Sequence, residues 1–196
     1  MESVPEPISE TPEPQEDKPG LASSAGRFLL RVLREVVGTV LPAVLIALLI
    51  NLFLAQATVV QGQSMEPSLH NDERVIVEKV TYRLIRGPRR GDVVIIEVAG
   101  QPEPLIKRVV GLPGETVAVQ GGQVFINGQP LEEEWAVQEG GPDYPPTRVP
   151  PLHIFVLGDN RGHSNDSRSF GPVLVDQVLG RAWLVYWPLE EVGPVH

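Results

Sequence analysis

Three groups of polar residues in this chain have the side-chain types that amide hydrolysis requires. Ser64 lies in the segment 62–69, which follows directly on a long apolar stretch. Lys107 lies in a mostly apolar run, and a dense polar segment occupies residues 158–168. A serine hydroxyl is a weak nucleophile until a base takes its proton, and a lysine with a lowered pKa is such a base. We therefore interpret the three groups as a nucleophile, a base and a loop that orients the base.

The surroundings of Lys107 decide whether it can act as a base. In an extended strand Leu105, Lys107 and Val109 share one face, and Arg108 points to the other face. An ammonium group between aliphatic neighbours on an inward face loses water, which lowers its pKa from about 10.4 toward about 7–8. The pattern alone leaves open the alternative that Lys107 reaches solvent or pairs with a carboxylate.

The polar segment 158–168 contains more hydrogen-bonding groups than a simple turn needs. Asp166 and Arg168 are spaced to form an ion pair, and Ser164 or Ser167 can hydrogen-bond an amine. The alternative is a loop whose polar side chains satisfy only one another. Ser64 has a similar alternative, which is an ordinary serine in a turn.

Composition excludes several classes of protein. The 196 residues contain no Cys, and the four His have no helical ligand spacing, so we expect neither disulfides nor a metal site. We expect no cofactor. The net charge is −9, and six of the acidic residues lie in the first twenty positions. No basic stripe interleaved with aromatic residues is present, so nucleic-acid binding is not expected.

The N-terminal third of the chain has the pattern of a tail followed by a membrane anchor. Residues 1–26 are predicted to be a disordered tail, because their Pro- and Glu-rich start has few large apolar side chains. Residues 27–35 form a basic juxtamembrane segment, and residues 36–57 are predicted to be a transmembrane helix. About 20 apolar residues suffice to cross a bilayer. The alternative is a buried core helix of a soluble domain.

Charge asymmetry around this segment predicts its orientation. Arg27, Arg31 and Arg34 precede it, and no Lys or Arg follows it until Arg74. The positive-inside rule then places the N-terminus in the cytoplasm and the remainder of the chain outside.

After residue 57 the apolar pattern is that of strands, so the fold class is predicted to be mainly β. The Gly121-Gly122 pair predicts a two-residue hairpin, and Asn127-Gly128 predicts the next turn. Residues 132–134 and 141–151 are predicted to be exposed loops. The predicted strands are 74–80, 92–98, 105–110, 117–120, 123–126, 153–157 and 182–187.

Four segments together resemble the boxes of bacterial type I signal peptidase, the membrane Ser-Lys endopeptidase of the leader peptidase family. They agree with that family in order and spacing between about residues 36 and 188. The segments are Ser64-Met65-Glu66-Pro67-Ser68-Leu69, Arg90-Gly91-Asp92-Val93-Val94, residues 107–115, and Gly158-Asp159-Asn160-Arg161 with Ser164, Asp166-Ser167-Arg168 and Gly171.

The resemblance implies a signal-peptidase-like catalytic β-core, a smaller β insertion and one preceding transmembrane helix. Residues 58–111 and 153–187 would form the core, residues 112–152 the insertion, and residues 188–196 a C-terminal tail.

The resemblance also assigns roles to individual residues. Ser64 would be the nucleophile and Lys107 the general base, with Ser164 orienting the lysine. Asp166 and Arg168 would be the ion pair that braces the loop. The backbone N–H of Ser64 would be one oxyanion donor, while Gly62 stands where some members carry a serine as second donor.

Substrates and location follow from the same resemblance. The partners would be the signal peptides of secreted preproteins and the lipid bilayer, at the plasma membrane, with a single span and the catalytic domain on the outer face. Cleavage would follow small residues. The Arg83, Arg86, Arg89 and Arg90 cluster would face either lipid headgroups or solvent. The residues matching the substrate pockets are Thr58, Val60, Met65, Leu69 and Ile106.

Three other functions fit parts of the pattern. One is another Ser-Lys protease, such as a self-cleaving repressor peptidase or a conjugation-type processing peptidase. A repressor should carry a DNA-binding domain, and none fits before residue 36. A silent membrane-anchored β-scaffold would not depend on Ser64. A Ser-His-Asp hydrolase would pair Ser64 with His163, but the Gly-x-Ser-x-Gly motif is absent.

Overall fold

The structure is a computed structural model that describes residues 21–49, 55–135 and 137–195. Side chains of residues 21–25 and of residue 83 lie outside this description. The chain divides into two compact units, one ending at Ile46 and one beginning at Ala47. Each unit is described by itself below.

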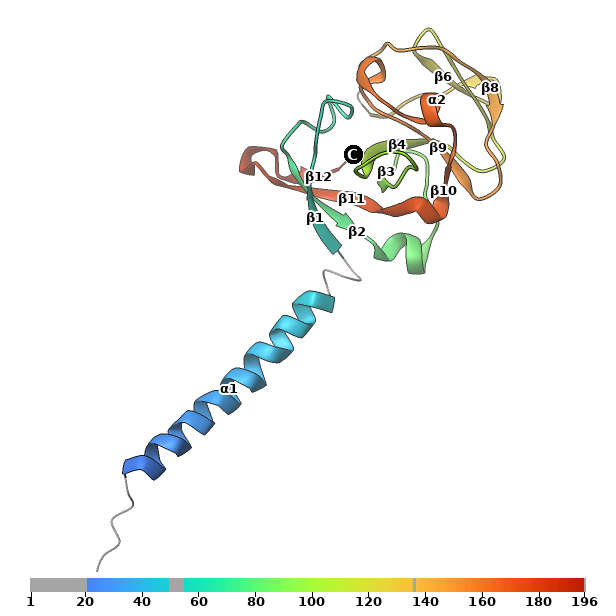
Figure 1. Cartoon of the computed structure of the whole chain (residues 1–196). Coiled ribbons are helices and arrows are strands. Elements are labelled where there is room, and N and C mark those ends of the chain that lie inside the picture. Colours follow the sequence, from blue (N-terminus) through green and yellow to red (C-terminus); the bar gives the residue numbers. More distant parts are fainter. Residues whose placement is uncertain (1–20, 50–54, 136, 196) are drawn as a thin grey trace, which may run out of the picture. The chain divides into compact units, whose positions relative to one another are not determined.

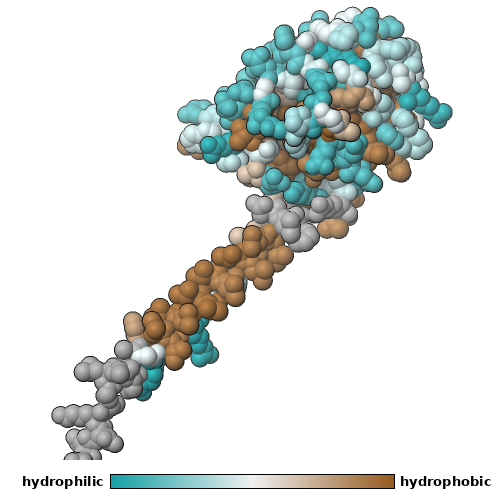
Figure 2. Space-filling view, viewed as in Figure 1, coloured by the Kyte–Doolittle hydropathy of each residue, from teal (hydrophilic) through white to brown (hydrophobic). Residues whose placement is uncertain are grey.

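One long helix, α1, spans Leu21–Leu49, and the boundary between the two units falls in its last turn. Its segment Gly26–Leu49 is long and apolar enough to cross a membrane by length and composition, and none of its most apolar stretch is buried by protein. Figure 2 shows its surface as mostly hydrophobic, with hydrophilic side chains toward its N-terminal end. Residues 26–49 are all exposed.

The bounds of this helix differ from those expected. Residues 21–26, assigned to the tail, are helical, because Leu21, Ala22 and Ala25 are good helix formers that extend the helix backwards. Residues 55–57, assigned to the membrane span, instead begin a strand. Residues 1–20 of the expected tail and residues 50–54 of the expected span lie outside the described residues.

The second unit is mainly β, as predicted, and is organised around an antiparallel sheet (Figure 1). At its C-terminal end the short strand β12 (Gly193–Pro194), which lies in the expected C-terminal tail, pairs with β11 (Val178–Trp187). The order across the sheet is β1 (Ala55–Val59), β2 (Arg74–Glu78), β11 (Val178–Trp187), β3 (Val93–Ile96), β4 (Leu105–Gly111), β9 (His153–Leu157) and β10 (Val173–Leu174).

A second, four-stranded sheet lies within the expected insertion. Gly121 and Gly122, both with positive φ, make the predicted hairpin between its strands β5 and β6. Strand β8 was expected to be an exposed loop because it contains two prolines; as an edge strand it tolerates them. The order is β7 (Gln129–Pro130), β6 (Gln123–Ile126), β5 (Thr116–Gln120) and β8 (Tyr144–Arg148).

Short helical turns occupy several of the connections. They are η2 (Thr81–Ile85), η3 (Arg161–His163), α2 (Ser167–Phe170), η4 (Val175–Gln177) and η5 (Leu189–Glu191).

A continuous apolar core joins the two sheets. Val110 from β4, Val117 from β5 and Phe155 from β9 are fully buried in one cluster. At Gly111 a Cβ would lie 2.5 Å from a Val117 methyl group and 2.8 Å from the Phe155 Cβ, so only glycine fits between the sheets there. This packing fixes β4, the strand that carries Lys107.

Candidate active site

Ser64 lies in the connection between β1 and β2. The turn around it is tight, because the Leu69 N–H donates to the Met65 carbonyl oxygen at 2.9 Å. Met65 and Leu69 are both buried in a cluster with Val60 and Val75. Two inward apolar side chains therefore hold the turn against the sheet and leave the Ser64 hydroxyl facing a cavity.

Lys107 approaches Ser64 from β4. Its Nζ lies 2.8 Å from the Ser64 Oγ and 2.7 Å from the Ile106 carbonyl oxygen. Only 2% of Lys107 is exposed, and none of its contacts in the described part of the chain is an ion pair. The lysine therefore neither reaches solvent nor pairs with a carboxylate in this structure.

The surroundings of Lys107 change its protonation. Burial lowers the pKa of the Lys107 amine from 10.5 to about 8, and the charges of Asp166 and Asp159 oppose this with smaller upward effects. A substantial fraction of the amine is then neutral near pH 8. A neutral amine at hydrogen-bond distance from a serine hydroxyl can accept its proton.

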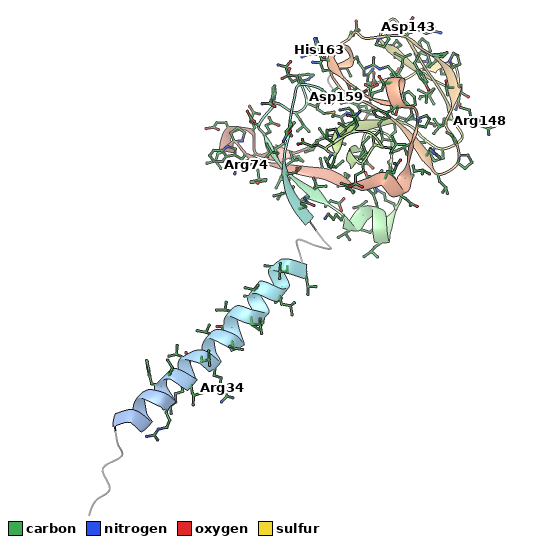
Figure 3. The ribbon with its side chains drawn as sticks, viewed as in Figure 1. Arg34, Arg74, Asp143, Arg148, Asp159 and His163 are labelled. Carbon is green, nitrogen blue, oxygen red and sulfur yellow. The ribbon has the colours of Figure 1, made fainter. Side chains whose placement is uncertain are left out.

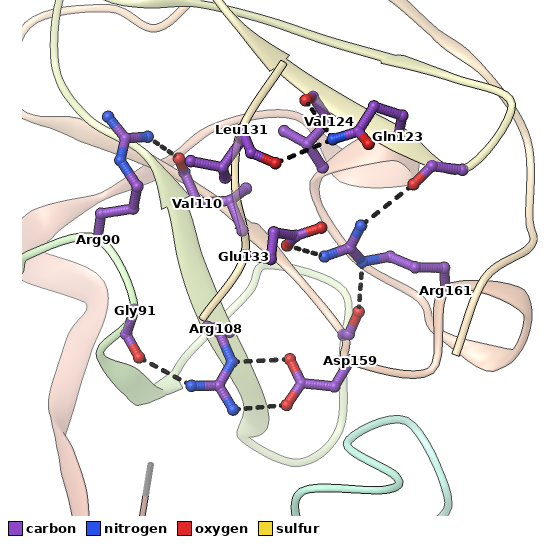
Figure 4. A network of polar contacts seen from close by, with 12 residues as sticks. Arg90, Gly91, Arg108, Val110, Gln123, Val124, Leu131, Glu133, Asp159 and Arg161 are labelled. Carbon is purple, nitrogen blue, oxygen red and sulfur yellow. Dashed lines mark hydrogen bonds and ion pairs between the residues drawn. The ribbon is translucent and has the colours of Figure 1, made fainter. Parts of the chain in front are cut away.

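A buried ion pair lies on the opposite face of β4. Arg108 donates to Asp159 through two hydrogen bonds of 2.8 and 2.6 Å, and a third goes from Arg108 to the Gly91 carbonyl oxygen (Figure 4). The Arg108 guanidinium also lies 4.9 Å from the centre of the Trp135 ring. Arg108 thus provides a positive charge beside one of the two carboxylates that raise the pKa of Lys107.

A second buried arginine joins the loop after β9 to the smaller sheet. Arg161 donates to the Gly158 carbonyl oxygen at 3.1 Å, to the Gly122 carbonyl oxygen and to the carboxylate of Glu133 (Figure 4). Sequence reasoning gave neither Arg108 nor Arg161 a role. Both lie within the motif segments, but the carboxylates that they pair with, Asp159 and Glu133, are far away in sequence.

The expected pairing of Asp166 with Arg168 is present. The carboxylate of Asp166 accepts from the Arg168 guanidinium at 2.9 and 2.8 Å and from the Gly158 N–H at 3.2 Å. Arg168 donates onward to the Arg161 carbonyl oxygen at 2.7 Å. The pair therefore connects the two ends of the polar loop.

Ser164 lies close to Ser64 but has no hydrogen bond to Lys107. Its Oγ is buried and has no hydrogen-bond partner among the described residues. A Cβ on Gly158 would lie 2.3 Å from that Oγ and 2.4 Å from the Ser64 carbonyl oxygen, so both serines border the same glycine. Orientation of Lys107 by Ser164 stays a prediction.

His163 is exposed at the surface of the unit. Figure 3 shows it at the outer edge of the unit, whereas Asp159 lies in the interior. The His163 ring nitrogen contacts the Asn160 side chain at 3.2 Å, and Ser64 is hydrogen-bonded to Lys107 instead. The geometry therefore favours lysine over histidine as partner of Ser64.

A cavity of about 340 Å³ opens beside Ser64 and Lys107. Of the five residues expected to bind substrate, Thr58, Val60 and Ile106 line it. Met65 and Leu69 do not line it, because they point into the core beneath. The other lining residues are Gln56, Val59, Gln61, Val77, Lys79, Ile95, Glu103, Pro104, Leu105 and Leu179.

The described residues contain no group of three or more His, Asp or Glu side chains arranged to hold a metal ion.

Comparison with known proteins places this site in a family. Residues 33–187 match the family model described as signal peptidase, peptidase S26, which covers most of the chain. The chain therefore belongs to the signal peptidase family, a family of membrane-associated serine proteases.

Similar proteins indicate which type of signal peptidase this chain is. Signal peptidase I from Leptolyngbya laminosa is 43% identical over 171 residues, which are 82% of this chain and 83% of that protein. Signal peptidase I S from Bacillus subtilis (strain 168) is 39% identical over 162 residues, which are 76% of this chain and 86% of that protein. The chain is thus an enzyme of the signal peptidase I type, a type that removes signal peptides.

A solved structure is also similar. The crystal structure of a signal peptidase I from Enterococcus faecalis V583 is 32% identical in sequence, with a TM-score of 0.43, and the match covers 49% of this chain and 97% of that chain.

Proposed function

We propose that this protein cuts N-terminal signal peptides from exported preproteins with Ser64 as nucleophile and Lys107 as general base. The observation that carries the proposal is the 2.8 Å contact between the Lys107 Nζ and the Ser64 Oγ. It is supported by the burial that lowers the pKa of this lysine to about 8.

The reaction proceeds in two steps. The neutral Lys107 amine takes the proton of the Ser64 hydroxyl as the Oγ adds to the scissile carbonyl carbon. The resulting ammonium then protonates the leaving amine, which departs as the mature protein. Water, deprotonated by Lys107, hydrolyses the acyl-enzyme and regenerates Ser64. The backbone N–H of Ser64 is the donor proposed for the developing oxyanion.

The cavity is suited to an extended peptide. Its walls come from the edge strand β1, through Thr58, and from the start of β4, through Ile106. An edge strand presents unpaired backbone groups to which a peptide can add as a further strand. The apolar side chains of Val60 and Ile106 leave room for small residues, which fits cleavage after such residues.

Anchoring by α1 completes the proposal. Arg27, Arg31 and Arg34 lie toward the N-terminal end of the helix, and the next basic residue is Arg74 in β2. This asymmetry supports a cytoplasmic N-terminus and an outward-facing catalytic domain at the plasma membrane.

The triplet Ala55-Gln56-Ala57 resembles a cleavage site for this same enzyme. It lies in β1, where Ala57 pairs with Ile76 of β2. A bond held in a sheet is not presented to a protease cavity, so we propose that the mature protein retains α1. Fractionation with membranes and an N-terminus before Thr58 would support this, and Thr58 as the mature N-terminus would contradict it.

Cleavage of a synthetic signal peptide by purified full-length protein tests the dyad. Ser64→Ala and Lys107→Ala should each abolish cleavage, because the two residues act as a unit. Lys107→Arg should also fail, since a guanidinium does not release its proton near neutral pH. Ser169→Ala, which changes an exposed serine on α2, is the control and should cleave normally. Substantial activity in Lys107→Arg would refute the lysine base.

A further inference from the structure

The connection between β7 and β8 of the smaller sheet includes an arm that packs on the unit's main sheet. This arm consists of residues 133–135, 137 and 138. Residues 132–134 were expected to be an exposed loop, yet the Glu133 side chain is only 12% exposed. The reason is that its carboxylate binds the fully buried Arg161 (Figure 4). The arm is therefore attached to the polar loop after β9.

The backbone of Gln138 pairs with the same polar loop as a short parallel bridge. Its N–H donates to the Asp159 carbonyl oxygen at 2.9 Å, and its carbonyl oxygen accepts from the Arg161 N–H at 2.9 Å. The residue between these two partners is Asn160, whose own N–H donates to the Ser64 carbonyl oxygen at 3.1 Å. Asn160 therefore lies between Gln138 on one side and the turn that carries Ser64 on the other.

A second attachment of the arm lies at Trp135. The Arg108 guanidinium lies 4.9 Å from the centre of the Trp135 ring, a distance that allows a cation–π contact. A Cβ on Gly91 would lie 3.3 Å from the same ring, so the indole packs directly on the Gly91 backbone. Arg108 in turn donates to the Asp159 carboxylate at 2.8 and 2.6 Å. Trp135 therefore holds the arginine that holds Asp159.

We infer that this arm is a positioning element for the nucleophile, an inference that rests on the proposed role of Ser64. The two attachments converge on Asp159, since Gln138 binds its carbonyl oxygen and Arg108 binds its carboxylate. With Asp159 fixed at both groups, the next residue, Asn160, presents its N–H to Ser64 in one place. The arm acts through Asn160, so its members are positioning residues and not catalytic ones.

The bond from Asn160 differs from the other contacts that hold this turn. Met65 and Leu69 fix the turn through burial in the core, but both follow Ser64 in the chain. The Asn160 bond is made to Ser64 itself, whose Oγ lies 2.8 Å from the Lys107 Nζ. A displacement of about 1 Å at such a site can cost about a hundredfold in rate. Loosening the arm should therefore lower kcat without weakening substrate binding.

Gln138 offers a test with a control at the same position, in the purified full-length protein. Gln138→Pro removes the N–H that donates to Asp159, whereas Gln138→Ala keeps the backbone and changes only an exposed side chain. The proline variant should cleave a synthetic signal peptide with a kcat about tenfold or more below that of the wild type and a KM within about twofold. The alanine variant should match the wild type. An unchanged kcat in Gln138→Pro, or a change confined to KM, would overturn the inference.

Trp135 tests the second attachment, and it decides if Gln138→Pro does not fold. Trp135→Ala should lower kcat about tenfold, and Trp135→Phe should restore most of it because an aromatic ring again covers Arg108. Val173→Ala controls for lost stability, since Val173 is buried in a different core cluster from the one that Trp135 packs against. It should lower Tm and keep kcat at temperatures below unfolding. Equal losses of kcat in Trp135→Ala and Val173→Ala would reduce Trp135 to a structural residue and overturn its positioning role.

Amide hydrogen exchange tests the link without any cleavage. In Gln138→Pro the amides of residues 62–69, the turn that carries Ser64, should exchange about tenfold faster than in the wild type, whereas those of Gln138→Ala should not change. Unchanged protection of this turn in the proline variant would overturn the inference. If the wild type cleaved no signal peptide while Gln138→Pro still loosened residues 62–69, the proposed function would fail and the link between the arm and the turn would stand.

Discussion

The Asn160 backbone N–H donates to the carbonyl oxygen of Ser64 at 3.1 Å. This bond connects the turn that carries Ser64 to the polar loop after β9. The same loop contains Ser164 and the Asp166–Arg168 pair. The position of the Ser64 hydroxyl therefore depends on the backbone of a segment about a hundred residues later in the chain.

Gly158 is predicted to be intolerant of a side chain. In Gly158→Ala the new methyl group would lie 2.4 Å from the Ser64 carbonyl oxygen and 2.3 Å from the Ser164 Oγ. We expect a loss of stability of about 1–3 kcal/mol from overpacking, and a fall in kcat of about a hundredfold or more because Ser64 is displaced. Urea denaturation and peptide cleavage measure the two effects.

Gly162→Ala is the matched control in the same loop. A Cβ there would meet no atom closer than 3.9 Å, so stability and cleavage should stay close to those of the wild type. If Gly158→Ala and Gly162→Ala lost stability and activity equally, the loop would be intolerant of any side chain. The contact between position 158 and Ser64 would then not explain the effect.

Activity is predicted to rise with pH through a single ionisation near pH 8. Burial lowers the pKa of Lys107 to about 8, and only the neutral amine can take the proton of Ser64. Below that value kcat/KM should fall about tenfold per pH unit, and above it the rate should level off. A flat profile between pH 5 and 9 would contradict the role of Lys107.

Lys107→Met is predicted to give an inactive but more stable protein at neutral pH. The folded-state pKa of Lys107 lies below its unfolded value of 10.5, so the unfolded state binds more protons between about pH 8 and 10.5. Wild-type stability therefore rises with pH across that window, and the burial cost is fully present below it.

The gain for Lys107→Met should be about 1–3 kcal/mol at pH 7 and should shrink toward pH 10.5. Urea denaturation of both proteins at pH 7 and pH 10 measures the difference. A gain that is the same at both pH values would arise from packing and would not reflect the buried charge.

The two neighbours Ser164 and His163 are predicted to differ in effect. Ser164→Ala should lower kcat substantially, because the Ser164 Oγ is buried and borders the Gly158–Ser64 contact. His163→Ala should keep most of the activity, since the His163 ring contacts the Asn160 side chain, whereas the Ser64 hydroxyl contacts Lys107. Cleavage assays on both variants measure the difference. A larger loss of activity in His163→Ala than in Ser164→Ala would favour a histidine base.

The sequence predicted the mainly β fold because its strands alternate and its turns carry Gly and Asn, as at Gly121-Gly122. It did not locate the end of α1, since the apolar run continues into β1 and conceals the change of period. Strand β8 was missed because its prolines are acceptable only on a sheet edge, and edge position is a property of the fold.

The site was predictable to a different extent. Ser64 and Lys107 were chosen from motif segments 43 residues apart, and the structure brings them together. The sequence pattern did not show that the side chains of Met65 and Leu69, which were expected to line the substrate pockets, are buried in the core. Arg108 and Asp159 are 51 residues apart, and Arg108 lies on the face of β4 opposite Lys107. No local sequence pattern therefore predicted their pairing.

The position of β11 in the sheet has a consequence for the timing of activity. This strand, residues 178–187, lies between β2 and β3. It therefore separates the β1–β2 hairpin, whose connection carries Ser64, from the β3–β4 hairpin, which carries Lys107. A ribosome adds residues in order, and the two hairpins cannot be joined until this late strand has been made and inserted. During translation Ser64 and Lys107 are therefore both present before the fold can hold them together, and their contact has to wait until residues 178–187 have been added.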